Sequence, residues 1–128
     1  EIDVAPLLLH YTAAVVRTLP ATLNHYLAEE NLSLSSSTYG TKLAISVGSG
    51  SKYPKHVDNM GLPDTRKLTC ILYLNPTWNP SSGGEIRCWG HEGICEDIAP
   101  IGDRLLLFWS DHVVHEVLEN WGSTSEDR

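Results

Sequence analysis

Three separated residues of this chain carry side chains that together could bind a metal ion. His56 and Asp58 lie in the run KYPKHVDN, and His115 lies in the run FWSDHVVHEV. If His56 and Asp58 share one strand, side chains two residues apart point to the same face, so an imidazole nitrogen and a carboxylate oxygen converge. A second histidine after an apolar strand could close a three-ligand face. The spacing therefore predicts a metal site at His56, Asp58 and His115.

Two imidazoles and one carboxylate with the opposite face open are the ligand set of non-haem Fe(II) oxygenases. Manganese, nickel, cobalt or zinc could occupy the same site. His112 competes with His115 for the third position. We favour His115 because it begins an alternating run that a strand would hold rigidly, whereas His112 follows Asp111 in an expected turn. Asp58 has a competing role as the residue that opens the turn-rich loop 59–64.

The other residues of metal-binding type carry weaker signals. His10 and His25 lie in a helical segment without a partner at useful spacing, and His91 follows a glycine in an expected turn. Cys88, His91 and Cys95 could contribute to a zinc site, but structural zinc needs four ligands and no second ligand pair accompanies them. Three cysteines do not make a disulfide framework, which favours a reducing, intracellular compartment, cytoplasmic or nuclear.

Length and composition limit the possible classes of protein. The chain has 128 residues, 41% of them hydrophobic, and a formal net charge of −7. This length suits one domain with a real core. The negative charge argues against a nucleic-acid partner, and no apolar run is long enough to span a bilayer. The first residues lack an initiator Met and the features of a signal peptide, which suggests that the sequence is a fragment.

Apolar spacing predicts helices first and strands afterwards. Residues 4–30 show apolar side chains every three to four positions, interrupted by Pro20, so either two helices or one kinked helix is expected. From Thr41 onward, short apolar runs alternate with Gly, Pro, Asn and Asp. We expect strands over residues 41–47, 53–58, 67–75, 84–89, 94–98, 104–110 and 113–118.

This order of elements predicts an α+β, mainly β fold. Runs such as LTCILYL and RLLLFW are apolar on both alternating sets, so both faces of these strands should be covered, with Cys70 as a small buried side chain. Helices followed by many short strands favour a jelly roll with an N-terminal helical buttress. We expect a single domain over residues 1–128, with its helical part at 4–30 and its jelly-roll core at 41–128.

From about Thr41 to Val117, the chain resembles the catalytic core of the 2-oxoglutarate- and Fe(II)-dependent prolyl hydroxylases. The most similar subgroup is that of the oxygen-sensing HIF prolyl hydroxylases. The matching pieces, in the order of the family, are YPKHVDN, TCILYLN, SGGEIRCW and DIAPIGDRLLLFWSD running up to HEV. The resemblance implies a double-stranded β-helix, and it implies that His56, Asp58 and His115 bind the metal without other catalytic residues.

The resemblance also implies a co-substrate site. Tyr73 falls where the family has a tyrosine that helps hold 2-oxoglutarate, although it could equally be a core aromatic. The family carries an arginine on the strand after the distal histidine, and Arg128 is the only arginine after His115. Because Arg128 is the last residue, we expect the C-terminal strand to be missing from this sequence or co-substrate binding to be impaired. Ser46 stands where the oxygen sensors have a tyrosine, which argues against an oxygen sensor.

The activity implied is hydroxylation of prolyl residues in a protein or peptide. Fe(II) would be the cofactor, 2-oxoglutarate and O2 the co-substrates, and ascorbate a candidate reductant. The loops 59–67 and 77–83 would contact an extended peptide, since they carry prolines and polar residues rather than a deep apolar pocket. The alternatives are a dioxygenase of the same fold acting on another residue or a small molecule, and a non-catalytic jelly-roll binding module.

Overall fold

The computed structural model describes residues 6–30 and 32–122, which form two compact units that divide between Lys42 and Leu43. The first unit consists of helix α1, Pro6–Tyr26, and the short 3-10 helix η1, Ala28–Glu30. Pro20 lies inside α1, so one helix forms where the sequence also allowed two. No helix in the described part of the chain is long and apolar enough to cross a membrane.

The side chain of Asn24 in α1 holds the segment that follows η1. The amide of Asn24 donates to the carbonyl oxygen of Leu34 at 2.9 Å and accepts from the backbone N–H of Leu34 at 2.8 Å. Two hydrogen bonds from one amide satisfy a backbone donor and acceptor that no strand ladder pairs. The expected role of this helix, as a buttress of the jelly roll, stays a prediction.

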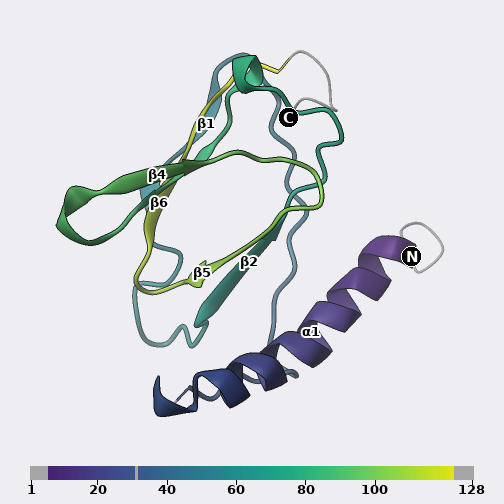
Figure 1. Cartoon of the computed structure of the whole chain (residues 1–128), viewed down its shortest axis with the longest axis vertical. Helices are drawn as coiled ribbons and strands as arrows, with labels where there is room; N and C mark the ends of the chain where they lie inside the picture. Colours follow the sequence, from purple (N-terminus) through teal and green to yellow (C-terminus); the bar gives the residue numbers. More distant parts are fainter. Residues whose placement is uncertain (1–5, 31, 123–128) are drawn as a thin grey trace. The chain divides into compact units, whose positions relative to one another are not determined.

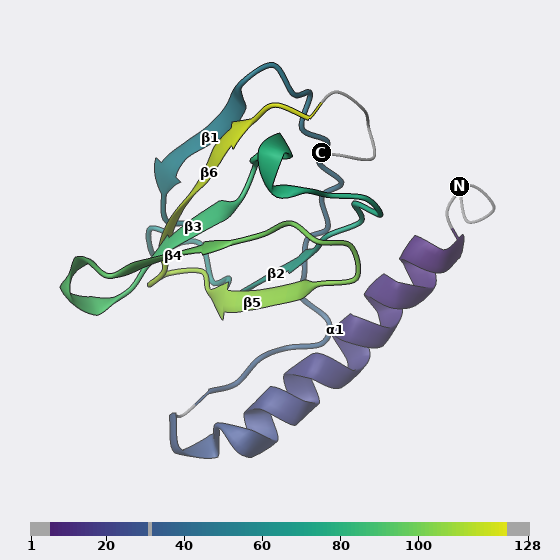
Figure 2. The ribbon, with the colours of Figure 1, turned by 45° about the horizontal axis from the view of Figure 1, so that its top comes forward.

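The second unit contains two antiparallel sheets (Figures 1 and 2). One sheet has four strands in the order β1-β6-β3-β4, and the other pairs β2 with β5. The strands are β1 Ser51–His56, β2 Leu68–Leu72, β3 Ile86–Trp89, β4 Cys95–Ile98, β5 Leu105–Trp109 and β6 Val114–Asn120. Two short 3-10 helices, η2 Pro80–Ser82 and η3 His91–Gly93, lie in the connections on either side of β3.

Strand β6 is central to the four-stranded sheet. His115 on β6 is the Cα partner of His56 on one side and of Cys88 on the other. Gly83, just before β3, has a φ of 63°, and a Cβ built there would lie 2.3 Å from the carbonyl oxygen of Glu119. Only glycine fits this approach. The SGG motif therefore lets the chain pass close against the end of β6.

The apolar core lies between the two sheets and is small. Ile86 on β3 is 1% exposed and Phe108 on β5 is 8% exposed. The runs LTCILYL and RLLLFW suggested that both faces of these strands are covered, but this is wrong for Cys70 on β2 and for Leu105 and Leu107 on β5, which are exposed. The two-stranded sheet turns one face inward, so alternate residues point outward.

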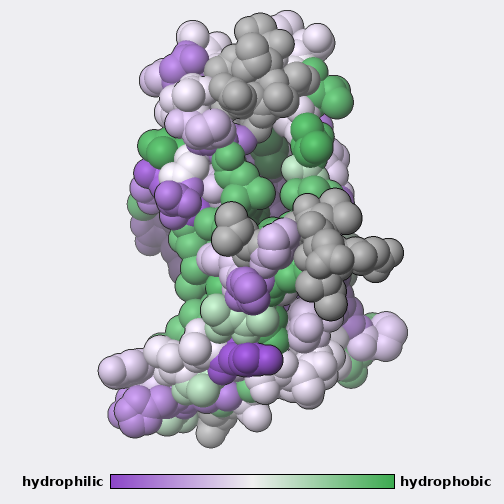
Figure 3. Space-filling model, turned by 90° about the vertical axis from the view of Figure 1, so that its right-hand side faces the viewer, coloured by the Kyte–Doolittle hydropathy of each residue, from purple (hydrophilic) through white to green (hydrophobic). Residues whose placement is uncertain are grey.

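The expected strand at 41–47 does not form, since these residues have no regular secondary structure. Leu43, Ile45 and Val47 alternate as a strand requires, but their exposed fractions are 64%, 72% and 70%. An alternating pattern makes a strand only when a neighbouring strand completes its hydrogen bonds. Figure 3 shows that hydrophobic residues also reach the exposed surface of the protein.

Candidate metal centre

His56 and His115 are brought together by strand pairing. They are Cα partners in the β1–β6 ladder, and their ring centroids lie 4.3 Å apart. Side chains at opposite positions of an antiparallel pair share a face, so both imidazoles point between the two sheets. Phe108 of the other sheet covers His115 at a centroid distance of 4.7 Å, and His115 is only 4% exposed. The register thus determines both the distance and the orientation of the imidazoles.

Backbone hydrogen bonds determine which nitrogen of each imidazole is free. Nδ1 of His56 lies 2.7 Å from the carbonyl oxygen of Pro54, and Nδ1 of His115 lies 3.1 Å from that of Val113. A carbonyl oxygen only accepts, so each Nδ1 carries the proton. With Nδ1 in this role, Nε2 of each ring is the nitrogen that faces the other groups and could bind a metal.

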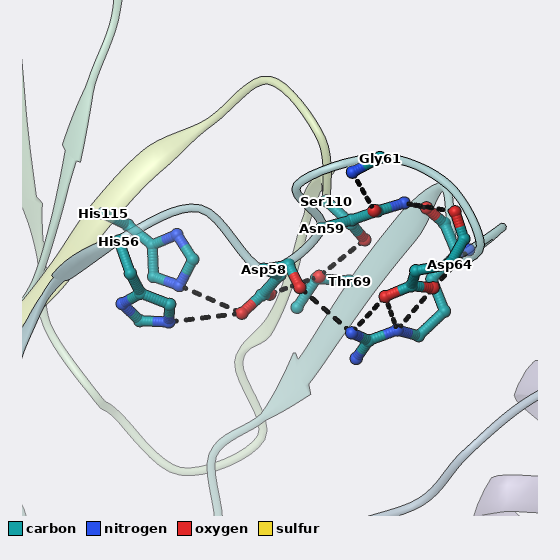
Figure 4. A network of polar contacts seen from close by, with 9 residues as sticks. His56, Asp58, Asn59, Gly61, Asp64, Thr69, Ser110 and His115 are labelled. Atoms are coloured by element: carbon teal, nitrogen blue, oxygen red, sulfur yellow. Dashed lines mark hydrogen bonds and ion pairs between the residues drawn. The ribbon is translucent and has the colours of Figure 1, made fainter.

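Asp58 reaches the same point from outside the strand. β1 ends at His56, and Asp58 lies in the bend that follows, so the expectation that His56 and Asp58 share one strand is wrong. Its Oδ1 nevertheless lies 3.3 Å from Nε2 of His56 and 3.6 Å from Nε2 of His115 (Figure 4). The bend therefore achieves the convergence that strand geometry had been expected to provide.

The geometry of the three groups fits a first-row metal ion. One ligand atom from each residue lies within 4.8 Å of the others. Ligands at roughly 2.1 Å from a metal and at right angles to each other are separated by about 3 Å, close to the two nitrogen–oxygen distances seen here. Two neutral imidazoles with free Nε2 atoms and one carboxylate are the donor set that Fe(II) accepts while open positions remain.

The carboxylate of Asp58 has a partner that the sequence did not indicate. Thr69 on β2 donates a hydrogen bond from its hydroxyl to Oδ2 of Asp58 at 2.6 Å, and the hydroxyl of Ser110 lies 2.8 Å from that of Thr69 (Figure 4). A threonine in an apolar strand carries no pattern that marks it as functional. Only the packing of β2 against the bend reveals the contact.

The other histidines and cysteines of the second unit do not belong to this group. His112 is exposed and hydrogen-bonded to Asp111, and His91 is exposed as expected. Cys88 pairs with Glu96 and Cys95 with Trp89 in the β3–β4 ladder, so the two thiols point to opposite faces. Among residues 6–30 and 32–122, His56, Asp58 and His115 form the group whose ligand atoms lie close enough to hold a metal ion, and the alternative zinc site is not assembled.

Tyr73 lies directly after β2, which ends at Leu72 rather than at residue 75 as expected. Its backbone still pairs with the other strand of that sheet, since its N–H donates to the carbonyl oxygen of Arg104 at 3.0 Å. Burial of the phenol, with the nearby Cys88 thiol, raises the pKa of Tyr73 to about 12, while Arg104 opposes the shift. The hydroxyl therefore keeps its proton at neutral pH and can donate it to an anion.

The described arginines of the second unit are engaged elsewhere. Arg66 pairs with Asp64, Arg87 with Asp97, and Arg104 donates to the carbonyl oxygen of Ala99 at 2.7 Å. These partners raise the pKa of Arg66 and Arg87 and lower that of both carboxyl groups. Arg128, the arginine expected to hold 2-oxoglutarate, lies outside the described residues.

Comparison with known proteins places this geometry in a family. The sequence profile of the 2OG-Fe(II) oxygenase superfamily matches residues 41–126, which include all three residues of the site. The chain belongs to this superfamily. Membership implies Fe(II) and 2-oxoglutarate, and the His-Asp-His group is the part of the chain that could hold the iron.

Individual relatives are prolyl hydroxylases. Prolyl hydroxylase EGLN3 of Homo sapiens is 42% identical over 79 residues, which cover 59% of this chain and 33% of that protein. A Trichoplax adhaerens prolyl hydroxylase, solved with a hypoxia inducible factor peptide, is 44% identical with a TM-score of 0.55 and covers 59% of this chain and 34% of that one. A Phytophthora capsici prolyl 4-hydroxylase is 37% identical with a TM-score of 0.73, and the match covers 84% of this chain and 37% of that one.

These likenesses confirm the predicted jelly-roll fold and the resemblance to prolyl hydroxylases. They also limit what the chain represents, because it spans about a third of the length of the EGLN3 relatives that it matches. The activity, substrate and partners of the whole protein are therefore matters for proposal.

Proposed function

We propose that this chain is the metal-binding core of an Fe(II)- and 2-oxoglutarate-dependent dioxygenase that hydroxylates prolyl residues of a protein or peptide. The observation that carries the proposal is the convergence of His56, Asp58 and His115, with ligand atoms within 4.8 Å of one another, in a chain whose relatives are prolyl hydroxylases. The ligand set supports iron, and the names of the relatives support the substrate class.

Each ligand has a defined task in this proposal. His56 and His115 would hold the metal through Nε2, with the backbone carbonyl groups keeping both rings in the required tautomer. Asp58 would supply an anionic oxygen, Oδ1, on the same face. Bound Fe(II) would supply the site at which O2 is the oxidant: one oxygen atom would enter succinate as 2-oxoglutarate loses CO2, and the other would hydroxylate a substrate carbon.

The chain would also orient the co-substrate and shield it from water. Tyr73, whose pKa is raised to about 12, would keep its proton and donate a hydrogen bond from its hydroxyl group to a carboxylate of 2-oxoglutarate. We propose Arg128 for the distal carboxylate, because a carboxylate removed from water requires a cation and the described arginines 66, 87 and 104 are committed to other groups. Ascorbate would serve to keep the iron reduced, and the three free thiols suit a reducing compartment.

The loop after Asp58 has the character of a peptide-binding wall. Met60 and Leu62 are 97% and 89% exposed, which is unusual for side chains of this size unless they meet a partner. An open hollow of about 350 Å³ lies beside them, lined by Val57, Asn59, Met60, Gly61 and Asp111. An extended peptide with an apolar prolyl ring suits this surface better than a free amino acid does.

Turnover distinguishes this proposal from its alternatives. Succinate formation should require 2-oxoglutarate, Fe(II) and a proline-containing peptide together, and His115→Ala should abolish it. Preference for free amino acids over peptides would indicate a dioxygenase of another substrate class. Binding of a peptide without succinate formation, by the wild type and His115→Ala alike, would indicate a binding module instead.

A further inference from the structure

The carboxylate of Asp58 requires support that its own backbone does not provide. Asp58 lies in a bend after β1, and its side chain is 23% exposed, so neither strand geometry nor tight burial determines its rotamer. Its two oxygens nevertheless have separate tasks. Oδ1 faces the Nε2 atoms of both imidazoles, and Oδ2 accepts the Thr69 hydroxyl at 2.6 Å.

The direction of the hydrogen bonds behind Asp58 follows from a count of protons. An ionised carboxylate only accepts, so Thr69 uses its one hydroxyl proton on Oδ2. In the 2.8 Å contact between the Thr69 and Ser110 hydroxyl groups, the proton must therefore come from Ser110. The result is a directed series of hydrogen bonds from Ser110 through Thr69 to Asp58 (Figure 4).

Ser110, where this series of hydrogen bonds begins, is itself held in place. Ser110 is 1% exposed, and its backbone N–H donates to the carbonyl oxygen of Lys67 at 2.9 Å. Its own carbonyl oxygen accepts the N–H of Asn59, the residue next to Asp58, also at 2.9 Å. Ser110 thus supports Asp58 indirectly in two ways. Its carbonyl oxygen holds the backbone of the next residue, and its hydroxyl group reaches the carboxylate by way of Thr69.

We propose that Thr69 and Ser110 are positioning residues that hold Asp58 as a ligand through one oxygen. This inference rests on the proposed function, because it takes the three residues to bind a metal. With Oδ2 occupied by a hydroxyl group, only Oδ1 is presented to the metal. A carboxylate that bound through both oxygens would take up a coordination position that 2-oxoglutarate or O2 needs.

The test compares Co(II) binding to the wild type and to variants that differ by one hydroxyl group. Thr69→Val keeps the shape of the side chain and removes its proton donor, and it should weaken Co(II) binding by at least about tenfold, the usual effect of removing a partner of a metal ligand. The visible absorption of bound Co(II) should change, because release of Oδ2 alters the number of ligand oxygens. Thr69→Ser should restore the affinity and the spectrum.

Two further variants complete the comparison. Ser110→Ala should weaken binding less than Thr69→Val, since Thr69 still donates to Asp58. Cys70→Ser, an exposed neighbour on the same strand, should leave affinity and spectrum unchanged. If Thr69→Val does not fold by circular dichroism, Ser110→Ala alone must weaken binding for the inference to stand.

The outcomes separate the inference from the proposed function. The positioning role would be overturned if Thr69→Val kept the wild-type affinity and spectrum while Asp58→Ala lost Co(II) binding. Where Thr69→Val does not fold, the same result in Ser110→Ala would overturn it. The metal centre itself would remain intact in either case. Equal Co(II) binding by the wild type and Asp58→Ala would overturn both.

Discussion

His56 and His115 sit opposite each other in paired strands, whereas Asp58 lies in a bend beyond the end of β1. The imidazoles are placed by the register of the four-stranded sheet, and each ring is oriented by a carbonyl group two residues earlier in the chain. The carboxylate is placed by side chains of the two-stranded sheet. The site therefore joins the two sheets. Its strand-held half, His56 and His115, should respond to mutation differently from its bend-held half, Asp58.

The largest effect should come from removing a ligand from the strand-held half. His115→Ala removes a buried imidazole and should reduce Co(II) or Fe(II) affinity by more than about 100-fold, beyond the range seen for indirect partners. His112→Ala is the matched control, since its side chain is 72% exposed and pairs with Asp111. Isothermal titration of both variants checks this, and loss of binding in His112→Ala alone would reverse the choice between the two histidines.

A second effect, on the free energy of unfolding rather than on metal affinity, should follow from weakening the core of the four-stranded sheet without touching the ligands. Ile86→Ala creates a cavity at a residue that is 1% exposed and should lower the free energy of unfolding by about 2–5 kcal/mol. Metal affinity of the folded protein should remain close to that of the wild type, because the β1–β6 register is retained. Ile94→Ala, at a side chain that is 70% exposed, provides the control.

Urea unfolding at neutral pH, followed by metal titration well below the transition, measures the two quantities separately. A large loss of affinity in folded Ile86→Ala would show that the strand-held half is less independent than we infer.

The bend-held half should be sensitive to the loop that carries it. The buried Asn59 side chain accepts from the N–H of Gly61 at 2.8 Å and donates to the carbonyl oxygen of Arg66 at 2.6 Å. Asn59→Ala leaves these groups unpaired and should cost about 1–3 kcal/mol of stability. It should also weaken metal binding, because Asp58 is the preceding residue.

Asn79→Ala is a matched control for this variant. Asn79 accepts from the N–H of Ser81 at 3.0 Å in the same way, but in an exposed turn that is not adjacent in sequence to any of the three candidate ligands. Denaturant unfolding with Co(II) titration should show weakened metal binding for Asn59→Ala only. Equal affinities in both variants would mean that the loop does not position the carboxylate.

The smallest effect should appear in acid, near the same loop. Hydrogen bonds from Lys67 and then His112 lower the pKa of Asp111 from 3.8 to about 2. Because the folded pKa lies below the unfolded one, the stabilisation is complete above about pH 4 and disappears as the pH falls toward 2. Its size should be below about 1 kcal/mol and should shrink in high salt, since Lys67 is half exposed.

Lys67→Gln tests this contribution, with Lys52→Gln, at another exposed ion pair, as its control. Urea unfolding of both variants at pH 5 and at pH 2.5 should show a difference for Lys67→Gln that narrows at the lower pH. An undiminished difference at pH 2.5 would mean that Lys67 stabilises the protein by something other than its charge.

Much of the architecture could be predicted from local pattern. Six of the seven expected strands form, each within a few residues of its predicted range, because alternating and apolar runs bounded by Gly, Pro and Asn leave few other conformations. The segment 41–47 shows where this reasoning stops. Its alternating side chains satisfy the pattern, but a strand also needs a partner, and none pairs with it among the described residues.

By itself, the sequence determined which residue types could bind a metal and which short runs carry them, because donor chemistry and chain spacing are local properties. Only the tertiary structure decided how Asp58 reaches the two imidazoles, since β1 ends before it and a bend completes the approach. The same holds for Thr69, which contacts Asp58 across 11 residues, and for Ser110, which contacts Thr69 across 41. Such contacts depend on which strands pack together, and no local pattern contains that information.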